Sequence, residues 1–195
     1  MSKIEESDVL ERLNLERGKY ILVSAHREEN IDNEENFKSL TDALNAIAKE
    51  YNIPVIYSTH PRSWKRIEEK GIVFHENIRQ LKPFGFYDYN KLQKEAFCVL
   101  SDSGSLAEES NIMGFPAVSL RTSTERPEAV DKGSMVLGGI DYDSITQAME
   151  VIIRQKSLVQ STVKVPDYTD VNVGIKVVNI IQGYTSVINK FIWRK

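Results

Sequence analysis

The chain has 195 residues, of which 41% are apolar, 25 are basic and 28 are acidic. The formal net charge of −3 gives no general electrostatic attraction to nucleic acid. No apolar run approaches the roughly 20 residues that a membrane-spanning helix needs, and the first residues lack the apolar core of a signal peptide. We therefore expect a cytoplasmic protein with neither nucleic acid nor membrane as a partner. Its single cysteine, Cys98, cannot form a disulfide within the chain, which fits a reducing compartment.

Strand and helix patterns alternate along the chain. Short apolar runs predict parallel strands covered on both faces, and apolar residues at helical spacing predict the helices between them. The predicted strands are residues 20–23, 53–57, 97–100, 116–120 and 135–137, with one further strand at either 72–74 or 78–81. The predicted helices are residues 37–47, 61–70, 89–95, 103–113, 128–132, 143–154 and 171–192.

This alternation predicts an α/β fold, in which βαβ units with right-handed crossovers build a doubly wound, Rossmann-like parallel sheet. Ligands of such sheets bind just beyond the carboxyl ends of the strands. His26, His60, Ser103 and Arg121 each come just after a predicted strand. We therefore expect these four residues to lie on one rim of the sheet.

The small residues Ser103, Gly104 and Ser105 predict an anion-binding site. They connect a strand to a helix, and the first backbone N–H groups of a helix have no partner within it. The spacing of Ser105 and Glu108 fits a capping box at the helix start. An anion should repel Glu108 and Glu109 unless one of them reaches past the phosphates to ribose hydroxyls. The pattern therefore favours a nucleotide with its sugar attached.

Two further polar loops follow strands near the start of the chain. Residues 24–30 contain His26 and Arg27, which can supply a proton donor and a phosphate clamp. The alternative is a solvated polar loop, and the spacing alone does not decide between the two. His60 lies in a similar loop with weaker support, and His75 is interpreted as a surface histidine.

A third polar loop, residues 121–128, follows a later strand. Arg121, Glu125 and Arg126 in this loop could contact a ligand, or they could lock the loop through Arg–Glu pairs. Both interpretations remain open. Pro127 can begin a short helix there, and Gly133 can end it.

We expect neither a metal nor a cofactor. The three histidines lie far apart in the sequence, and Cys98 lies inside a strand, so no pair has the spacing of zinc ligands. The glycine-rich dinucleotide fingerprint and the P-loop pattern are both absent from the sequence, which argues against dinucleotide binding and ATP hydrolysis.

The loops together resemble the non-hydrolysing UDP-N-acetylglucosamine 2-epimerases. That family carries a histidine-arginine-glutamate loop, here 24–30, an Asp-Ser-Gly turn followed by Glu-Glu, here 102–109, and a Thr-Glu-Arg-Pro-Glu loop, here 124–128. Residues 60–62 and 89–92 look closest to a branch that acts on UDP-N-acetyl-fucosamine-type sugars in capsule and O-antigen pathways, which build cell-envelope polysaccharides.

The resemblance covers only half of the family's fold. The family has two Rossmann-like domains with the active site between them, like the GT-B glycosyltransferases, and this chain matches the C-terminal one. Residues 1–195 are therefore expected to be a single nucleotide-sugar-binding domain. Its expected partner is the N-terminal domain of the family, which this chain does not contain. The helix at 171–192 is expected either to pack on its own sheet or to reach another domain or chain; the resemblance favours the missing domain. A homodimer remains open.

The resemblance also implies roles for individual residues. It places the diphosphate at Ser103, Gly104 and Ser105, and it gives catalytic-site positions to His26 and Arg27. It places the ribose hydroxyls at Glu109 with Glu108 beside it, the uracil against Tyr89, and a second, regulatory nucleotide-sugar at His60.

The implied reaction inverts C2 of a UDP-N-acetylhexosamine by elimination and re-addition of UDP, without a cofactor. The carboxylates that move the C2 proton would lie in the missing half, so the chain is expected to be inactive alone. Two other functions remain open: the UDP-sugar-binding half of a GT-B glycosyltransferase, and a non-catalytic module that binds a nucleotide-sugar.

Overall fold

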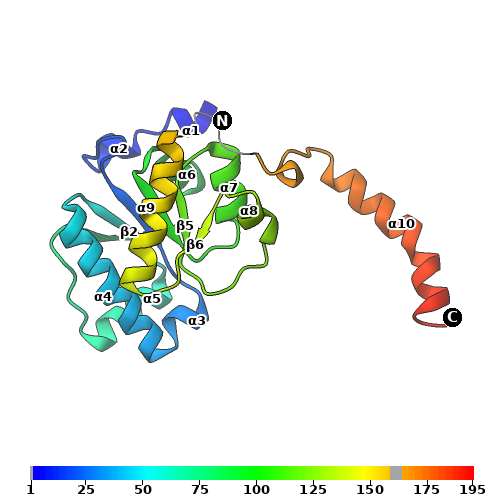
Figure 1. The fold of residues 1–195 in the computed structure, drawn as a ribbon, viewed down its shortest axis with the longest axis horizontal. Helices are drawn as coiled ribbons and strands as arrows, with labels where there is room; N and C mark the ends of the chain where they lie inside the picture. Colours follow the sequence, from blue (N-terminus) through cyan, green and yellow to red (C-terminus); the bar gives the residue numbers. More distant parts are fainter. Residues whose placement is uncertain (1, 159–163) are drawn as a thin grey trace. The chain divides into compact units, whose positions relative to one another are not determined.

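The structure is a computed structural model that describes residues 2–158 and 164–195. It divides into two compact units, Met1–Val165 and Pro166–Lys195. The first unit contains a parallel sheet with helices around it, and the second contains one long helix (Figure 1).

The first unit is built on a six-stranded parallel sheet with the strand order β3-β2-β1-β4-β5-β6. The strands are β1 (Ile21–Ser24), β2 (Val55–Ser58), β3 (Ile78–Leu81), β4 (Cys98–Ser101), β5 (Ala117–Ser119) and β6 (Val136–Leu137). Ile21 in β1 is aligned with Val55 on one side and with Cys98 on the other. The strands β1 and β4 therefore form the centre of the sheet, although more than 70 residues separate them in the sequence.

Helices cover both faces of this sheet (Figure 1). The helices are α1 (Ser2–Glu5), α2 (Val9–Arg12), α3 (Glu28–Ile31), α4 (Glu34–Tyr51), α5 (Pro61–Lys70), α6 (Phe86–Glu95), α7 (Leu106–Met113), α8 (Pro127–Asp131) and α9 (Tyr142–Leu158). The main core cluster joins α4, α5 and α9 to strand residues such as Val23 and Leu100. Leu22 and Val99, which alternate with them along the strands, are equally buried and point to the opposite face.

The predicted α/β fold is confirmed, with strand boundaries that differ from the predicted ones by one or two residues. The segment 78–81 is the strand that pairs with β2, whereas Ile72 and Phe74 pack on the core from outside the sheet. Helix α7 begins later than predicted, at Leu106, because residues 104–105 form a turn before it.

Two short helices at the start of the chain, α1 and α2, were not predicted. Their apolar side chains Ile4 and Val9 are buried, and the Ser7 hydroxyl between them donates a 2.6 Å hydrogen bond to Asp88 on α6. Each helix has only four residues, so neither shows a helical repeat of apolar positions.

The second unit consists of a short 3₁₀ turn (Pro166–Tyr168) and helix α10 (Val173–Phe191), within the helix predicted at 171–192. Its apolar side chains, including Ile180, Ile188 and Phe191, are exposed. Across residues 2–158 and 164–195, no helix has the length and apolar content needed to cross a membrane. The packing of α10 on another domain stays a prediction.

A candidate anion-binding site beside β1 and β4

The candidate site forms where two neighbouring strands end. Ser24 of β1 is aligned with Ser101 of β4, so the loops that follow these strands lie side by side. The backbone N–H groups of His26 and Arg27, in the loop after β1, each donate a 2.8 Å hydrogen bond to Oδ2 of Asp102, directly after β4. The two loops that carry the predicted diphosphate and catalytic residues are therefore joined.

The turn before α7 offers several unpaired hydrogen-bond donors. Among the described residues, the backbone N–H groups of Gly104, Ser105, Ala107 and Glu108 have no acceptor. Two neighbouring amides are occupied: that of Ser103 donates to Ser101 Oγ at 3.1 Å, and that of Leu106 donates to Ser103 O at 3.3 Å. Four open amides at a helix start can hold an anion, because they and the helix dipole both favour negative charge there.

Arg27 adds a positive charge to this turn. A methyl group placed on Gly104 would lie 3.9 Å from Nη2 of Arg27, so the guanidinium extends over the glycine. The hydroxyls of Ser103 and Ser105 lie 3.1 Å apart beside the same turn. The arrangement combines amides, hydroxyls and a guanidinium, which is the donor set that a phosphate needs.

The predicted capping box is wrong. Ser105 has helical backbone angles, φ −70° and ψ −9°, and its side chain makes no cap hydrogen bond. A capping serine needs an extended backbone to reach the amide three residues on. The Ser105 hydroxyl instead donates to Oε1 of Glu109 at 2.9 Å, and Glu108 pairs with Arg126 at 2.6 Å. As a result, the Glu108 amide is left open for a ligand.

Glu109, the predicted ribose ligand, is oriented from two sides. Its Oε1 accepts the bond from Ser105, and its Oε2 accepts a 2.6 Å hydrogen bond from Nε2 of the buried Gln93 on α6. A carboxylate has about four acceptor positions, so two remain for ligand hydroxyls. Gln93 was not predicted as a site residue, because a glutamine on a helix carries no local signal of such a role.

Tyr89, also on α6, lies at the same strand ends. Its hydroxyl lies near Ser24 and Ser101, the last residues of β1 and β4. Burial raises the pKa of Tyr89 to about 12, so the phenol stays protonated at neutral pH. The structure thus places the Tyr89 hydroxyl at the ends of β1 and β4, while its predicted contact with uracil stays a prediction.

The loop after β5 is locked by Arg–Glu pairs. Arg121 is 4% exposed and holds Glu125 through two 2.7 Å hydrogen bonds, with Glu29 3.3 Å away on its other side. The hydrogen bonds from Arg121 hold the pKa of Glu125 down at about 2. Because Arg27 Nη1 also lies 3.9 Å from Glu125 Oε1, this carboxylate sits between two guanidinium groups.

The two histidines predicted for the site are neighbours. The rings of His26 and His60 have centroids 5.7 Å apart. His60 precedes α5, and its Nδ1 accepts a 3.2 Å hydrogen bond from the Arg62 amide. The structure therefore brings all the predicted site residues into one connected cluster, and the role of each in binding or catalysis stays a prediction.

No group of three or more histidine, cysteine, aspartate or glutamate residues in the described part of the chain could hold a metal ion. Cys98 is buried within β4, and burial raises the pKa of its thiol to about 12. The thiol is therefore protonated, unreactive and part of the core.

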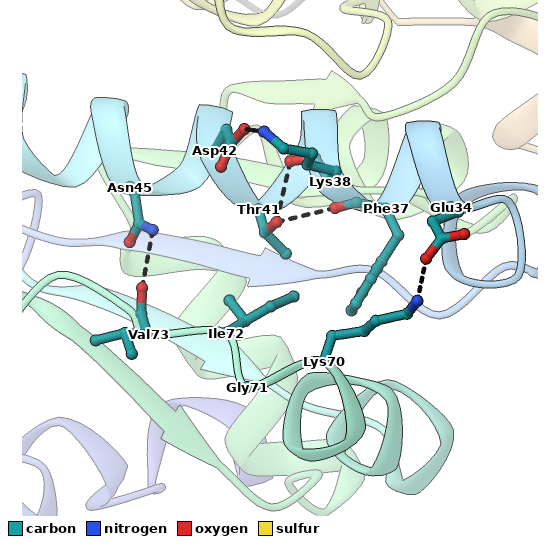
Figure 2. A pocket seen from close by; sticks show the side chains of 10 residues that line it. All are labelled: Glu34, Phe37, Lys38, Thr41, Asp42, Asn45, Lys70, Gly71, Ile72 and Val73. Atoms are coloured by element: carbon teal, nitrogen blue, oxygen red, sulfur yellow. Dashed lines mark hydrogen bonds and ion pairs between the residues drawn. The ribbon is translucent and has the colours of Figure 1, made fainter.

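A pocket lies away from this site, between α4 and the segment that joins α5 to β3 (Figure 2). Most of its polar groups already have partners within the chain: Lys70 pairs with Glu34, and Asn45 donates to the Val73 carbonyl oxygen at 3.1 Å. The lining residues are Glu34, Phe37, Lys38, Thr41, Asp42, Asn45, Lys70, Gly71, Ile72 and Val73. None of the predicted site residues is among them.

Comparisons with known proteins agree on one family. A family model described as UDP-N-acetylglucosamine 2-epimerase matches residues 1–182. A curated relative named UDP-N-acetylglucosamine 2-epimerase, from Methanococcus maripaludis, is 36% identical over 85% of this chain and 45% of its own length. One from Methanocaldococcus jannaschii with the same name is 34% identical over 70% of this chain and 38% of its own length.

Solved structures give the same result. The UDP-N-acetylglucosamine 2-epimerase of Rickettsia bellii matches with a TM-score of 0.80 and 37% identity, over 100% of this chain and 52% of that one. The Methanocaldococcus jannaschii UDP-GlcNAc 2-epimerase, solved in complex with UDP-GlcNAc and UDP, matches with a TM-score of 0.79 and 29% identity, over 93% and 50%. The chain thus spans about half the length of the proteins that it matches.

Proposed function

Because this chain belongs to the UDP-N-acetylglucosamine 2-epimerase family, we propose that it is the UDP-binding half of an enzyme that inverts C2 of a UDP-N-acetylhexosamine. The observation that carries the proposal is the group of four open amides at the start of α7, next to Arg27 and His26. This donor set fits a diphosphate, and the complex of one related structure with UDP-GlcNAc and UDP supports the choice of ligand.

The proposed reaction proceeds by elimination and re-addition of UDP. Loss of the C2 proton accompanies cleavage of the bond between C1 and the diphosphate oxygen, which leaves a glycal-type intermediate and UDP. UDP then adds back to C1, and C2 receives a proton on the opposite face. In both directions the negative charge on the diphosphate must be stabilised, and the amides, Arg27 and a protonated His26 would do so without a metal.

The other site residues have proposed roles that follow from their positions. Glu109 would accept hydrogen bonds from the ribose hydroxyls. The Ser103 hydroxyl and the open amides of Gly104 and Ser105 would donate to the phosphates, since the Ser105 hydroxyl already donates to Glu109. Tyr89 would lie against the uracil. Arg121 and Arg126, with their partners Glu125 and Glu108, would hold the loop after β5 in place beside the phosphates.

The partner of this half would be an N-terminal domain of similar size. The carboxylates that move the C2 proton would come from that domain. We therefore propose that the isolated chain does not catalyse the inversion at C2. The exposed apolar side chains of α10, Ile180 and Phe191 among them, suit a helix that packs on it. We place the enzyme in the cytoplasm, in the synthesis of cell-envelope polysaccharide, with a UDP-N-acetyl-fucosamine-type sugar as one candidate substrate.

Calorimetric titration of the chain tests the binding step. We expect UDP to bind and uridine to bind far more weakly, because the open amides would hold the diphosphate. Arg27→Ala should weaken UDP binding, whereas Lys38→Ala, a loss of the same kind of charge in the remote pocket, should not. Equal affinities for UDP and uridine would contradict the proposed diphosphate site.

Isotope exchange tests the reaction. We expect that the chain mixed with a separately produced N-terminal half in D₂O incorporates deuterium at C2 of a UDP-N-acetylhexosamine, and that the chain alone does not. A glycosyltransferase half or a non-catalytic module would bind UDP without any exchange at C2. Exchange by the chain alone would show that the proton-moving groups lie in this half.

A further inference from the structure

Asp102 is the most completely buried charged group at the site. It has no exposed surface, and its Oδ2 accepts three hydrogen bonds. Two come from the His26 and Arg27 amides in the loop after β1, at 2.8 Å, and one comes from Asn30 Nδ2 on α3, at 3.1 Å. Asn30 is itself buried and also donates to the Leu120 carbonyl oxygen at 3.0 Å. One oxygen of this carboxylate therefore fixes the shape of the loop.

The second oxygen of Asp102 faces the imidazole of His26. Among the described residues, Oδ1 has no hydrogen-bond partner, although it is fully buried. It lies 3.3 Å from Nδ1 of His26, and the His26 side chain is 42% exposed. A buried carboxylate oxygen without a donor is costly, and a small rotation of the imidazole would align an N–H group on Nδ1 with this oxygen.

We infer that Asp102 is a positioning residue that holds His26 in the tautomer with its proton on Nδ1. In this tautomer Nε2, on the far side of the ring from the buried carboxylate, carries the lone pair. That nitrogen can take up a proton and present it to an anion at the neighbouring turn. The link to diphosphate chemistry rests on the proposed function, whereas the tautomer itself does not.

The other two histidines make the inference specific. Nδ1 of His60 accepts a hydrogen bond from the Arg62 amide, and Nδ1 of His75 accepts one from the Asn77 amide, both at 3.2 Å. A nitrogen that accepts a hydrogen bond carries no proton, so both of these rings should have their proton on Nε2 when neutral. The neutral ring of His26 should therefore carry its proton on Nδ1, whereas those of His60 and His75 carry it on Nε2, and one spectrum can show both tautomers.

Nitrogen NMR of the ¹⁵N-labelled chain without ligand tests this. At about pH 9, where ordinary imidazoles are neutral, long-range ¹H–¹⁵N correlations separate the two tautomers. We expect the Nδ1–H pattern for His26 and the Nε2–H pattern for His60 and His75. Spectra of His26→Gln and His60→Gln assign the signals. A His26 signal with the proton on Nε2 would overturn the inference.

Asp102→Asn should reverse the direction of the hydrogen bond between residue 102 and Nδ1 of His26, while the three bonds to the other side-chain oxygen position are kept. The three N–H groups that surround Oδ2 require an acceptor, so the carbonyl oxygen of the new asparagine should take that place. Its NH₂ group would then donate to Nδ1 of His26 and shift the proton to Nε2. A folded variant in which His26 keeps the Nδ1–H pattern would also overturn the inference.

Asn30→Ala is the matched control, because it removes a donor from Oδ2 and leaves Oδ1 untouched. It should leave the His26 tautomer unchanged, and a changed tautomer there would contradict a specific role for Oδ1. If Asp102→Asn fails to fold, the wild-type spectrum and the Asn30→Ala control still decide whether His26 carries its proton on Nδ1. None of these readouts uses UDP, so a chain that fails to bind UDP would refute the proposed function and leave the tautomer result standing.

Discussion

Replacement of Gly104 by alanine should separate ligand binding from folding. The added methyl group would meet only Nη2 of Arg27, at 3.9 Å, which is an ordinary van der Waals distance. Gly104 also lacks the positive φ angle seen at Gly71 and Gly114. We therefore expect the variant to fold with nearly unchanged stability.

The same methyl group occupies the space between the open amides and the Arg27 guanidinium, where the diphosphate would lie. Displacing a phosphate oxygen from this position removes at least one hydrogen bond to a charged group, which contributes about 1.5–3 kcal/mol. Because each 1.4 kcal/mol corresponds to a tenfold change, UDP affinity should fall by about 10- to 150-fold.

Calorimetric titration with UDP measures this loss, and thermal unfolding monitors the fold. Gly183→Ala on α10 is the control, since it makes the same chemical change where no heavy atom lies within 4 Å of the new methyl group. Equal UDP affinities for Gly104→Ala and the wild-type chain, with both folded, would refute the placement of the diphosphate at this turn.

Three further predictions concern individual side chains. Glu109→Ala should weaken binding of UDP and of uridine by a similar factor, as titrations would show, because the ribose is common to both; a loss confined to UDP would contradict a ribose contact. The carboxyl of Glu125 should titrate near its pKa of about 2 rather than 4.5 in a carbon NMR titration, and Arg121→Ala should raise the value. Because the pKa of Glu125 is lower in the folded chain than in the unfolded chain, the Arg121–Glu125 pair stabilises the fold fully above pH 4.5. This stabilisation is lost as the pH falls towards 2. A Glu125 pKa of 4.5 in the folded chain would refute the pair. Cys98 should react with a thiol reagent only on unfolding, and fast labelling of the native chain would contradict its burial.

Most of the fold could be predicted because β1, β2, β4 and β5 are short, largely apolar runs buried on both faces, which have few alternative interpretations. The third strand was ambiguous for a physical reason. Residues 72–74 and 78–81 each contain apolar side chains that reach the core, and only the backbone pairing of 78–81 with β2 separates them. The helices α1 and α2 could not be predicted, because four residues are too few to show apolar side chains at helical spacing.

The residues of the candidate site could be predicted, but their connections could not. The position of Ser103 and Gly104 between a strand and a helix indicated open amides, and the structure has them. The capping box failed because the backbone angles of Ser105, not the spacing of residue types, decide where its hydroxyl points. The three bonds to Asp102 join segments more than 70 residues apart, which no local pattern records.

The strand order has a consequence for how this protein can change. The chain leaves β1 towards α4 on one face of the sheet and leaves β4 towards α7 on the other, so neither crossover passes over the ends of these two strands. A substitution in either loop can therefore alter the site without displacing a helix that crosses above it. We expect changes of loop length, by contrast, to shift the amides at the start of α7, because only residues 102–105 join that helix to β4.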